Sequence, residues 1–168
     1  MSPFSYTQKG NIRMDNTFEK DLKRGRFGEE LVSRTFEALG YELKDVSDDS
    51  DFWIEDVDYI TADGFKYEVK TDYRFHSTGN LALESAIIYK SSQEEKLSWL
   101  WTSKADYFCF VDAEDDTKFY TISSKDLRHL VKTEHFRRVL KDDGYKFIDL
   151  YLLPLEQYID CFNVIETA

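Results

Sequence analysis

The chain has 168 residues, of which 22 are Lys or Arg and 33 are Asp or Glu, so its formal net charge is −11. Its hydrophobic content of 42%, with 16% aromatic residues, is enough to build a core and excludes an intrinsically disordered chain. Seven Gly and two Pro exclude a low-complexity or collagen-like segment. The negative charge argues against a simple basic protein that coats nucleic acid, although a local site can differ in charge from the total.

The N-terminal segment predicts a loose arm followed by a long helix. Residues 1–15 are polar, and we expect them to form the arm. A helix is predicted over residues 16–39, because Asn16 with Glu19 resembles an N-terminal cap and Gly40 is a good C-terminal stop. Apolar residues recur along one stripe of this helix, which consists of Phe18, Leu22, Val32, Phe36 and Leu39.

The rest of the chain predicts mainly strands. In chain order we expect a strand at 41–46, an acidic loop at 47–51, and a hairpin of 52–62 and 65–71 around Asp63-Gly64. A loop at 73–80, a strand at 81–89 and a short helix or excursion at 91–104 follow. Next we expect a second hairpin of 107–112 and 118–122 and a helix capped by Ser123 or Ser124. The tail from 145 to 165 is apolar enough to pack and is interrupted by Pro154. With no repeat and no linker, the sequence predicts a single α/β domain over residues 1–168.

The sequence also lacks segments typical of export or membrane insertion. Residues 1–14 contain no apolar run, which predicts that there is no signal peptide, and no stretch approaches 18 consecutive apolar residues. Cys109 lies in an apolar run and is interpreted as a core residue, so a disulfide framework with Cys161 is not expected. We therefore expect a cytoplasmic protein with no membrane partner.

The acidic residues are concentrated in one segment. Residues 41–63 carry one basic and nine acidic side chains, and Asp45 to Asp58 contains seven acids and no base. A solvated loop with strand-edge carboxylates would explain this pattern. The alternative is that some of these carboxylates belong to a divalent-cation site, because hard cations need clustered oxygen ligands.

The register of the first hairpin bears on this choice. A two-residue loop at Asp63-Gly64 would pair Asp58 with Val69, whereas a three-residue loop with left-handed Gly64 would pair Asp58 with Glu68. Only the second register separates apolar from polar side chains. We therefore expect that register, because a slip by one residue would move every side chain to the opposite face of the hairpin. One face then holds Val57, Tyr59, Thr61, Phe65, Tyr67 and Val69, and the other holds Asp56, Asp58, Ile60, Lys66, Glu68 and Lys70.

Glu29 is a further candidate, since it falls on the inward stripe of the helix. It shares that stripe with Val32 and Phe36, whereas its neighbour Glu30 falls on the outward face. A carboxylate on an apolar stripe is costly unless it meets a cation, a metal or a hydrogen-bond donor. Glu29 therefore needs a partner, unless it reaches solvent at the edge of the stripe.

The chain contains three motif elements in order: a helix with a glutamate, an acidic residue in a hairpin, and an E-x-K triplet. They are Gly25-Arg26-Phe27-Gly28-Glu29-Glu30-Leu31-Val32, Asp58 and Glu68-Val69-Lys70. This arrangement resembles the PD-(D/E)xK nuclease superfamily, and most closely its phage-type and Holliday-junction-resolvase-like members. Val57 stands where the family often has proline, and Asp51 and Asp56 are alternatives to Asp58 as the motif aspartate. The resemblance implies a restriction-endonuclease-like α/β fold, with a central mixed β-sheet, an N-terminal helix and flanking helices.

The resemblance also implies roles for the motif residues. Asp58, Glu68, the Val69 carbonyl and Glu29 would hold Mg²⁺ or Mn²⁺, which supports phosphodiester hydrolysis by polarising the phosphate and activating water. Lys70 would orient the water or stabilise the developing charge. The implied activity is that of a metal-dependent endonuclease acting on DNA, and cleavage of branched DNA, which needs two cuts, would favour a homodimer.

Polar residues near the motif are candidates for contacts to DNA, because they cluster in a Gly-containing loop and on the adjoining strand. They are Lys66, Arg74, His76, Thr78 and Asn80. An ordinary solvated loop would show the same composition.

Two other classes of function remain open. The chain could be a catalytically silent relative that binds DNA or a protein, although such a relative need not keep Asp58, Glu68 and Lys70 together. It could also be an acidic interaction protein that mimics DNA, in which Lys70 and an inward Glu29 would have no role.

Overall fold

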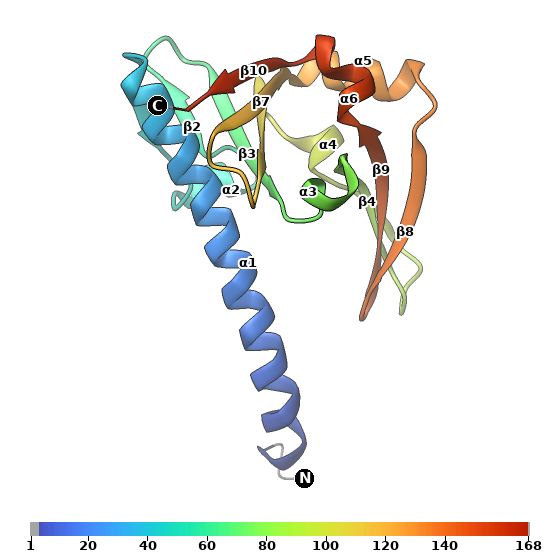
Figure 1. The fold of residues 1–168 in the computed structure, drawn as a ribbon. Helices are drawn as coiled ribbons and strands as arrows, with labels where there is room; N and C mark the ends of the chain where they lie inside the picture. The colour runs from blue at the N-terminus through green and yellow to red at the C-terminus, as the bar shows by residue number, and fades with distance from the viewer. Residues whose placement is uncertain (1–3, 168) are drawn as a thin grey trace.

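The structure, a computed structural model, describes the backbone of residues 4–167 and the side chains of residues 19–167. The chain is an α/β protein in which a long N-terminal helix covers one face of a mixed sheet, and a second, antiparallel sheet lies on the other side (Figure 1). The mixed sheet is therefore the central layer. The predicted α/β class and mixed central sheet are confirmed, whereas the second sheet is an addition.

The first helix is α1, Phe4–Ala38. It begins well before residue 16, so residues 4–15 are helical rather than a loose arm, and Asn16 lies inside the helix instead of capping it. Gly40 ends the helix as predicted, with φ of 91° and its N–H donating to the Glu37 carbonyl at 3.0 Å.

The predicted apolar stripe of α1 holds only in its central part. Val32 and Phe36 are buried, together with Leu31, against the mixed sheet. Leu22 and Leu39 are 43% and 59% exposed, so these two positions of the stripe are not part of the core. Phe18 lies outside the residues whose side chains are described.

The mixed sheet has six strands in the order β1-β2-β3-β6-β7-β10. They are β1 (Leu43–Asp45), β2 (Tyr59–Thr61), β3 (Lys66–Asp72), β6 (Tyr107–Asp112), β7 (Lys118–Ser123) and β10 (Asn163–Glu166). Only β3 and β6 pair in parallel, and the chain between them crosses over through the second sheet. Parallel neighbours need such a long connection, so the parallel pair is what places the second sheet beside β3.

The predicted register of the first hairpin is confirmed. Tyr59 pairs with Tyr67 and Ile60 with Lys66, and Gly64 has φ of 91° in a three-residue loop. Continued by one residue, this register places Asp58 opposite Glu68.

The first strand of that hairpin is much shorter than predicted. Residues 50–53 form the helix α2 (Ser50–Trp53), and a turn with φ of 50° at Asp56 follows it. Asp49 caps α2 by accepting a hydrogen bond from the Asp51 backbone N–H, which is the usual way a short acidic stretch starts a helix.

The second sheet has four strands in the order β5-β4-β9-β8. They are β4 (Asn80–Tyr89), β5 (Glu95–Leu97), β8 (Arg137–Asp143) and β9 (Lys146–Pro154). The sequence predicts β4 but not the β8–β9 hairpin, which turns at Gly144 with φ of 73°. The charged residues of β8 hide an edge strand, since they leave no alternation of apolar and polar side chains.

The remaining helices are short. They are α3 (Phe75–Thr78), α4 (Trp99–Thr102), α5 (Ser124–Thr133), α6 (Leu155–Tyr158) and the 3₁₀ helix η1 (Ile159–Cys161). Ser123 caps α5 by accepting from the Asp126 N–H, as predicted. Among the described residues, none of the helices has the length and apolar character needed to cross a bilayer.

The two larger of three hydrophobic clusters lie on opposite faces of the mixed sheet. One joins α1 to the sheet through Val32, Val69 and Phe119. The other joins the sheet to the second sheet, α4 and α5, through residues such as Phe108, Leu83 and Leu100. The face of β3 that carries Glu68 and Lys70 therefore points towards the second sheet rather than towards open solvent.

Candidate functional site

The site is built on the central strand β3, whose alternation places Glu68 and Lys70 on the same face. Glu68 is only 7% exposed, and its Oε1 lies 2.8 Å from Lys70 Nζ. The Lys70 ammonium also lies 4.8 Å from the centre of the Trp99 ring, which packs on Phe108 and Phe110. Lys70 is thereby held between a buried carboxylate and an aromatic ring.

Burial and charge act in opposite directions on Lys70. Desolvation lowers the pKa of the Lys70 ammonium, but Glu68 and, more weakly, Asp56 and Asp58 outweigh it and raise that pKa. The lysine therefore carries its charge at neutral pH, so it can donate hydrogen bonds to an anionic group.

Asp58 stands directly before β2 and reaches across to β3. Its Oδ2 accepts a hydrogen bond of 2.8 Å from the Val69 backbone N–H, while its own N–H donates to the Tyr67 carbonyl at 2.9 Å. Burial, followed by repulsion from Glu68, raises the pKa of Asp58 from 3.8 to about 8, although the Val69 N–H opposes the rise. The structure thus places the Asp58 and Glu68 carboxylates side by side, as the predicted register requires.

Glu29 belongs to α1, which packs on the opposite face of the mixed sheet, and its charge interacts with that of Glu68. It is half-buried, whereas Glu30 is exposed, as the predicted stripe requires. Burial and then the charges of Asp45 and Glu68 raise the pKa of Glu29 from 4.5 to about 6. The Tyr59 hydroxyl donates to the Glu29 carbonyl at 3.0 Å and ties this turn of the helix to β2.

The hairpin brings Asp58, Glu68 and Lys70 together, and the charge of Glu29 acts on this group from α1. Glu29, Asp58 and Glu68 repel one another in a partly dehydrated space, and the charges of Lys70 and, at Glu29, Arg26 offset only part of this repulsion. Carboxylate oxygens are the ligand type that Mg²⁺ and Mn²⁺ prefer, so the donor set and its excess negative charge fit a divalent cation. The side chains are not already gathered around one point, because no group of three or more His, Cys, Asp or Glu within the described part of the chain could hold a metal ion as it stands.

Two further carboxylates belong to this cluster. Asp56 is partly buried, and burial raises its pKa while Lys70 opposes the rise; Glu68 and Glu84 act on it in the same direction as burial. Glu84 comes from β4 of the second sheet and accepts a hydrogen bond from the Ser98 hydroxyl. Sequence reasoning missed Glu84, because only the packing of the second sheet on the mixed sheet brings it near Asp56. We refer to Glu29, Asp56, Asp58, Glu68, Lys70 and Glu84 as the β3 cluster.

The alternatives for the motif aspartate separate in the structure. Asp51 is exposed in α2. Asp56 and Asp58 both lie beside Glu68, and only Asp58 is hydrogen-bonded to β3.

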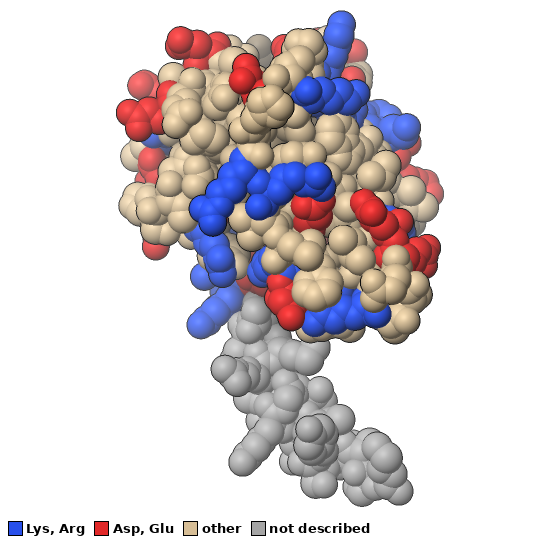
Figure 2. All heavy atoms as spheres, turned by 90° about the vertical axis from the view of Figure 1, so that its right-hand side faces the viewer, with Lys and Arg blue, Asp and Glu red and all other residues tan. Residues whose placement is uncertain are grey.

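The predicted nucleic-acid contacts fall into two groups. Arg74, Thr78 and Asn80 follow the carboxyl end of β3 and line a common pocket of about 250 Å³ together with Lys141. Lys66 lies at the opposite end of β3, roughly 20 Å along the strand from this first group. It forms an ion pair of 3.0 Å with Glu55. Figure 2 shows Lys and Arg side chains gathered across the middle of the side of the molecule where β8 lies in Figure 1.

His76 is held near the first group by an acidic partner. Its Nδ1 lies 2.8 Å from Asp112 Oδ2, and this hydrogen bond raises the pKa of His76. The imidazole is exposed, so it remains accessible to solvent and ligands.

Comparison of the chain with models of known protein families and with curated proteins found no match.

Proposed function

We propose that the protein is a metal-dependent nuclease that hydrolyses phosphodiester bonds in DNA. The observation that carries this proposal is the β3 cluster, in which Asp58 and Glu68 lie side by side, Lys70 pairs with Glu68, and the charge of Glu29 acts on this group from α1. The proposal includes a restriction-endonuclease-like fold, which the order of α1, the β2–β3 hairpin and the mixed sheet supports.

In this proposal the carboxylates and the Val69 carbonyl would hold Mg²⁺ or Mn²⁺. A divalent cation there would supply a polarised phosphate and a more acidic water. The chain itself contributes Lys70, whose ammonium is charged and already oriented by Glu68 and Trp99. It can donate to an anionic phosphate oxygen without reorganising, which is how a preorganised donor lowers a barrier.

The setting of the activity follows from the same proposal. We expect the protein to act in the cytoplasm, where Cys109 and Cys161, both free thiols, would stay reduced. An endonuclease that resolves branched DNA has to make two cuts, so such a substrate would favour a homodimer.

Cleavage assays test the proposal directly. Supercoiled, linear and branched DNA would be incubated with Mg²⁺ or Mn²⁺ and the wild-type protein, Asp58→Asn, Glu68→Gln or Lys70→Met. We expect the wild type to cleave at least one substrate and each variant to lose about 10²-fold or more in rate. Glu30→Gln and Asp51→Asn are matched controls, since both acids are exposed and lie outside the β3 cluster.

One observation favours a second candidate, a catalytically silent nuclease-fold protein that binds DNA or a protein. Lys70 and Asp58 are already satisfied by Glu68 and the Val69 N–H, and no group of three ligands is pre-arranged among the described residues. Binding of DNA without cleavage by the wild type, with either metal, would support the silent protein and reject the nuclease.

A further inference from the structure

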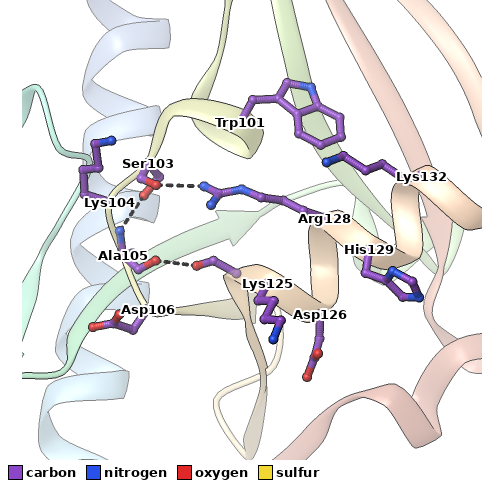
Figure 3. A pocket seen from close by; sticks show the side chains of 11 residues that line it. Trp101, Ser103, Lys104, Ala105, Asp106, Lys125, Asp126, Arg128, His129 and Lys132 are labelled. Carbon is purple, nitrogen blue, oxygen red and sulfur yellow. Dashed lines mark hydrogen bonds between the residues drawn. The ribbon is translucent and has the colours of Figure 1, made fainter.

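A large pocket lies on the far side of α4 from the β3 cluster. It has a volume of about 870 Å³ and is formed by the end of α4, the segment 103–106 and one face of α5 from its first turn to its last. Figure 3 shows Lys132 beside Trp101, Arg128 below them and directed at Ser103, and Lys104 on the other side of Ser103. No residue of the β3 cluster lines it.

The pocket is basic although the protein is strongly acidic. Lys104, Lys125, Arg128 and Lys132 line it, against two carboxylates, Asp106 and Asp126. One of these carboxylates is engaged, because Asp106 Oδ2 accepts a hydrogen bond of 2.8 Å from the Lys66 backbone N–H. The lining therefore carries a net charge of +2 in a chain whose net charge is −11.

Its three lysines are available to a ligand. Lys104, Lys125 and Lys132 are exposed, and among residues 19–167 none of them lies in an ion pair. Lys132 Nζ lies 5.6 Å from the centre of the Trp101 ring. Because the ring is uncharged, this contact does not neutralise the ammonium.

Arg128 forms a fixed cationic wall of the pocket. Its Nε and Nη2 donate to the carbonyls of Leu100 and Ser103 at 2.7 and 2.8 Å. Carbonyls satisfy these donors without neutralising the charge, and burial lowers the pKa of the guanidinium. An anion in the pocket would therefore meet a positive charge that is already in place.

The pocket is joined by hydrogen bonds to Asp56 of the β3 cluster and to its neighbour Glu55. The Ser103 hydroxyl donates to the Asp56 carbonyl at 3.0 Å, and the Lys104 N–H donates to the Glu55 carbonyl at 2.7 Å. In α4, Trp99 contacts Lys70 while Trp101 lines the pocket. The helix α4 therefore lies between the pocket and Lys70.

We infer that this pocket binds the phosphodiester backbone of DNA beside the position that is cut. The inference rests on the proposed function for the identity of the polyanion. Exposed lysines around a hydrogen-bonded arginine suit a chain of phosphates, because such contacts need charge rather than a particular base sequence.

The test is DNA binding by the triple variant Lys104→Ala, Lys125→Ala, Lys132→Ala. Anisotropy of a labelled DNA duplex would be measured in EDTA at several salt concentrations, so that no cleavage occurs. The matched control replaces Lys44, Lys96 and Lys118, which changes the net charge equally outside the pocket. We expect the pocket variant to lose about tenfold or more in affinity at low salt and the salt slope to fall by about two to three.

The outcomes separate this inference from the proposed function. Equal affinity of the pocket and control variants would overturn the inference even if the wild type cleaves DNA. Loss of binding in the pocket variant alone would support it even if no metal produces cleavage, in which case the nuclease proposal fails. Poly-glutamate that competes as well as DNA, charge for charge, would assign the pocket to an acidic polypeptide and would also overturn the inference.

Discussion

Gly28 of α1 lies so close to Thr71 of β3 that a Cβ at position 28 would stand 1.9 Å from Thr71 Oγ1. This contact sets how closely the helix approaches the sheet. It also limits how far Glu29 can lie from β3, because Glu29 follows Gly28 and Lys70 precedes Thr71. The Thr71 hydroxyl is buried without a hydrogen-bond partner among the described residues, so no hydrogen bond offsets the cost of removing it from water.

Replacing Gly28 with alanine should destabilise the protein by about 1–3 kcal/mol, since the new methyl group overpacks this contact. Gly25→Ala is the matched control, because nothing lies within 4 Å of a Cβ there and alanine favours a helix by about 1 kcal/mol. Urea denaturation of both variants measures the difference. Adding Thr71→Ala to Gly28→Ala should restore part of the loss, and equal stability of the two glycine variants would contradict the contact.

Removing Lys70 should destabilise the protein, because it leaves Glu68 buried without its counter-charge. For Lys70→Met we expect a loss of about 2–4 kcal/mol in the free energy of unfolding. Glu68→Gln on the Lys70→Met background should recover much of it, because the buried charge is then gone. A double-mutant cycle from urea denaturation gives the coupling, and independent effects of the two substitutions would show that the pair does not form.

Asp58 should make the metal-free protein less stable as pH rises. Its pKa is raised from 3.8 to about 8 in the folded state, so folding favours the protonated acid. This contribution is complete below pH 3.8, declines as pH rises towards 8 and is lost above that. Glu29, whose pKa is raised to about 6, acts in the same direction.

Asp58→Asn should remove this dependence, because asparagine keeps an acceptor for the Val69 N–H but does not titrate. Its stability relative to the wild type should grow between pH 4 and pH 8 by an amount on the order of a few kcal/mol. Urea denaturation across that range, in EDTA, measures the difference. Parallel stability curves for the two proteins would mean that Asp58 titrates normally.

Divalent cations should stabilise the fold if the β3 cluster binds them. At a Mn²⁺ concentration about ten times its Kd, the free energy of unfolding should rise by about 1.4 kcal/mol, and Tm should rise with it. Glu68→Gln should lose the effect and Glu30→Gln should keep it. Tm measured at matched ionic strength excludes general screening, and equal shifts in all three proteins would place the metal elsewhere.

Local patterns in the sequence were reliable guides to part of the fold. The helix stop at Gly40, the three-residue loop at Gly64 and the Ser123 cap were predicted, because each depends on a few neighbouring residues. The β8–β9 hairpin was not predicted, since an edge strand with charged side chains carries no periodic signal. The start of α1 was also wrong, because the polar residues before Asn16 give no apolar stripe.

For the site, the sequence by itself determined that Asp58 would face Glu68 and that Lys70 would share their side of the hairpin. That result follows from the two-residue alternation of strands and the length of one turn, which are local properties. Only the tertiary structure decided that this face is covered by the second sheet, that Glu84 and Trp99 join it, and that a basic pocket lies across α4. Those contacts join segments far apart in the chain, and they form because the parallel pairing of β3 with β6 carries the intervening chain over the site.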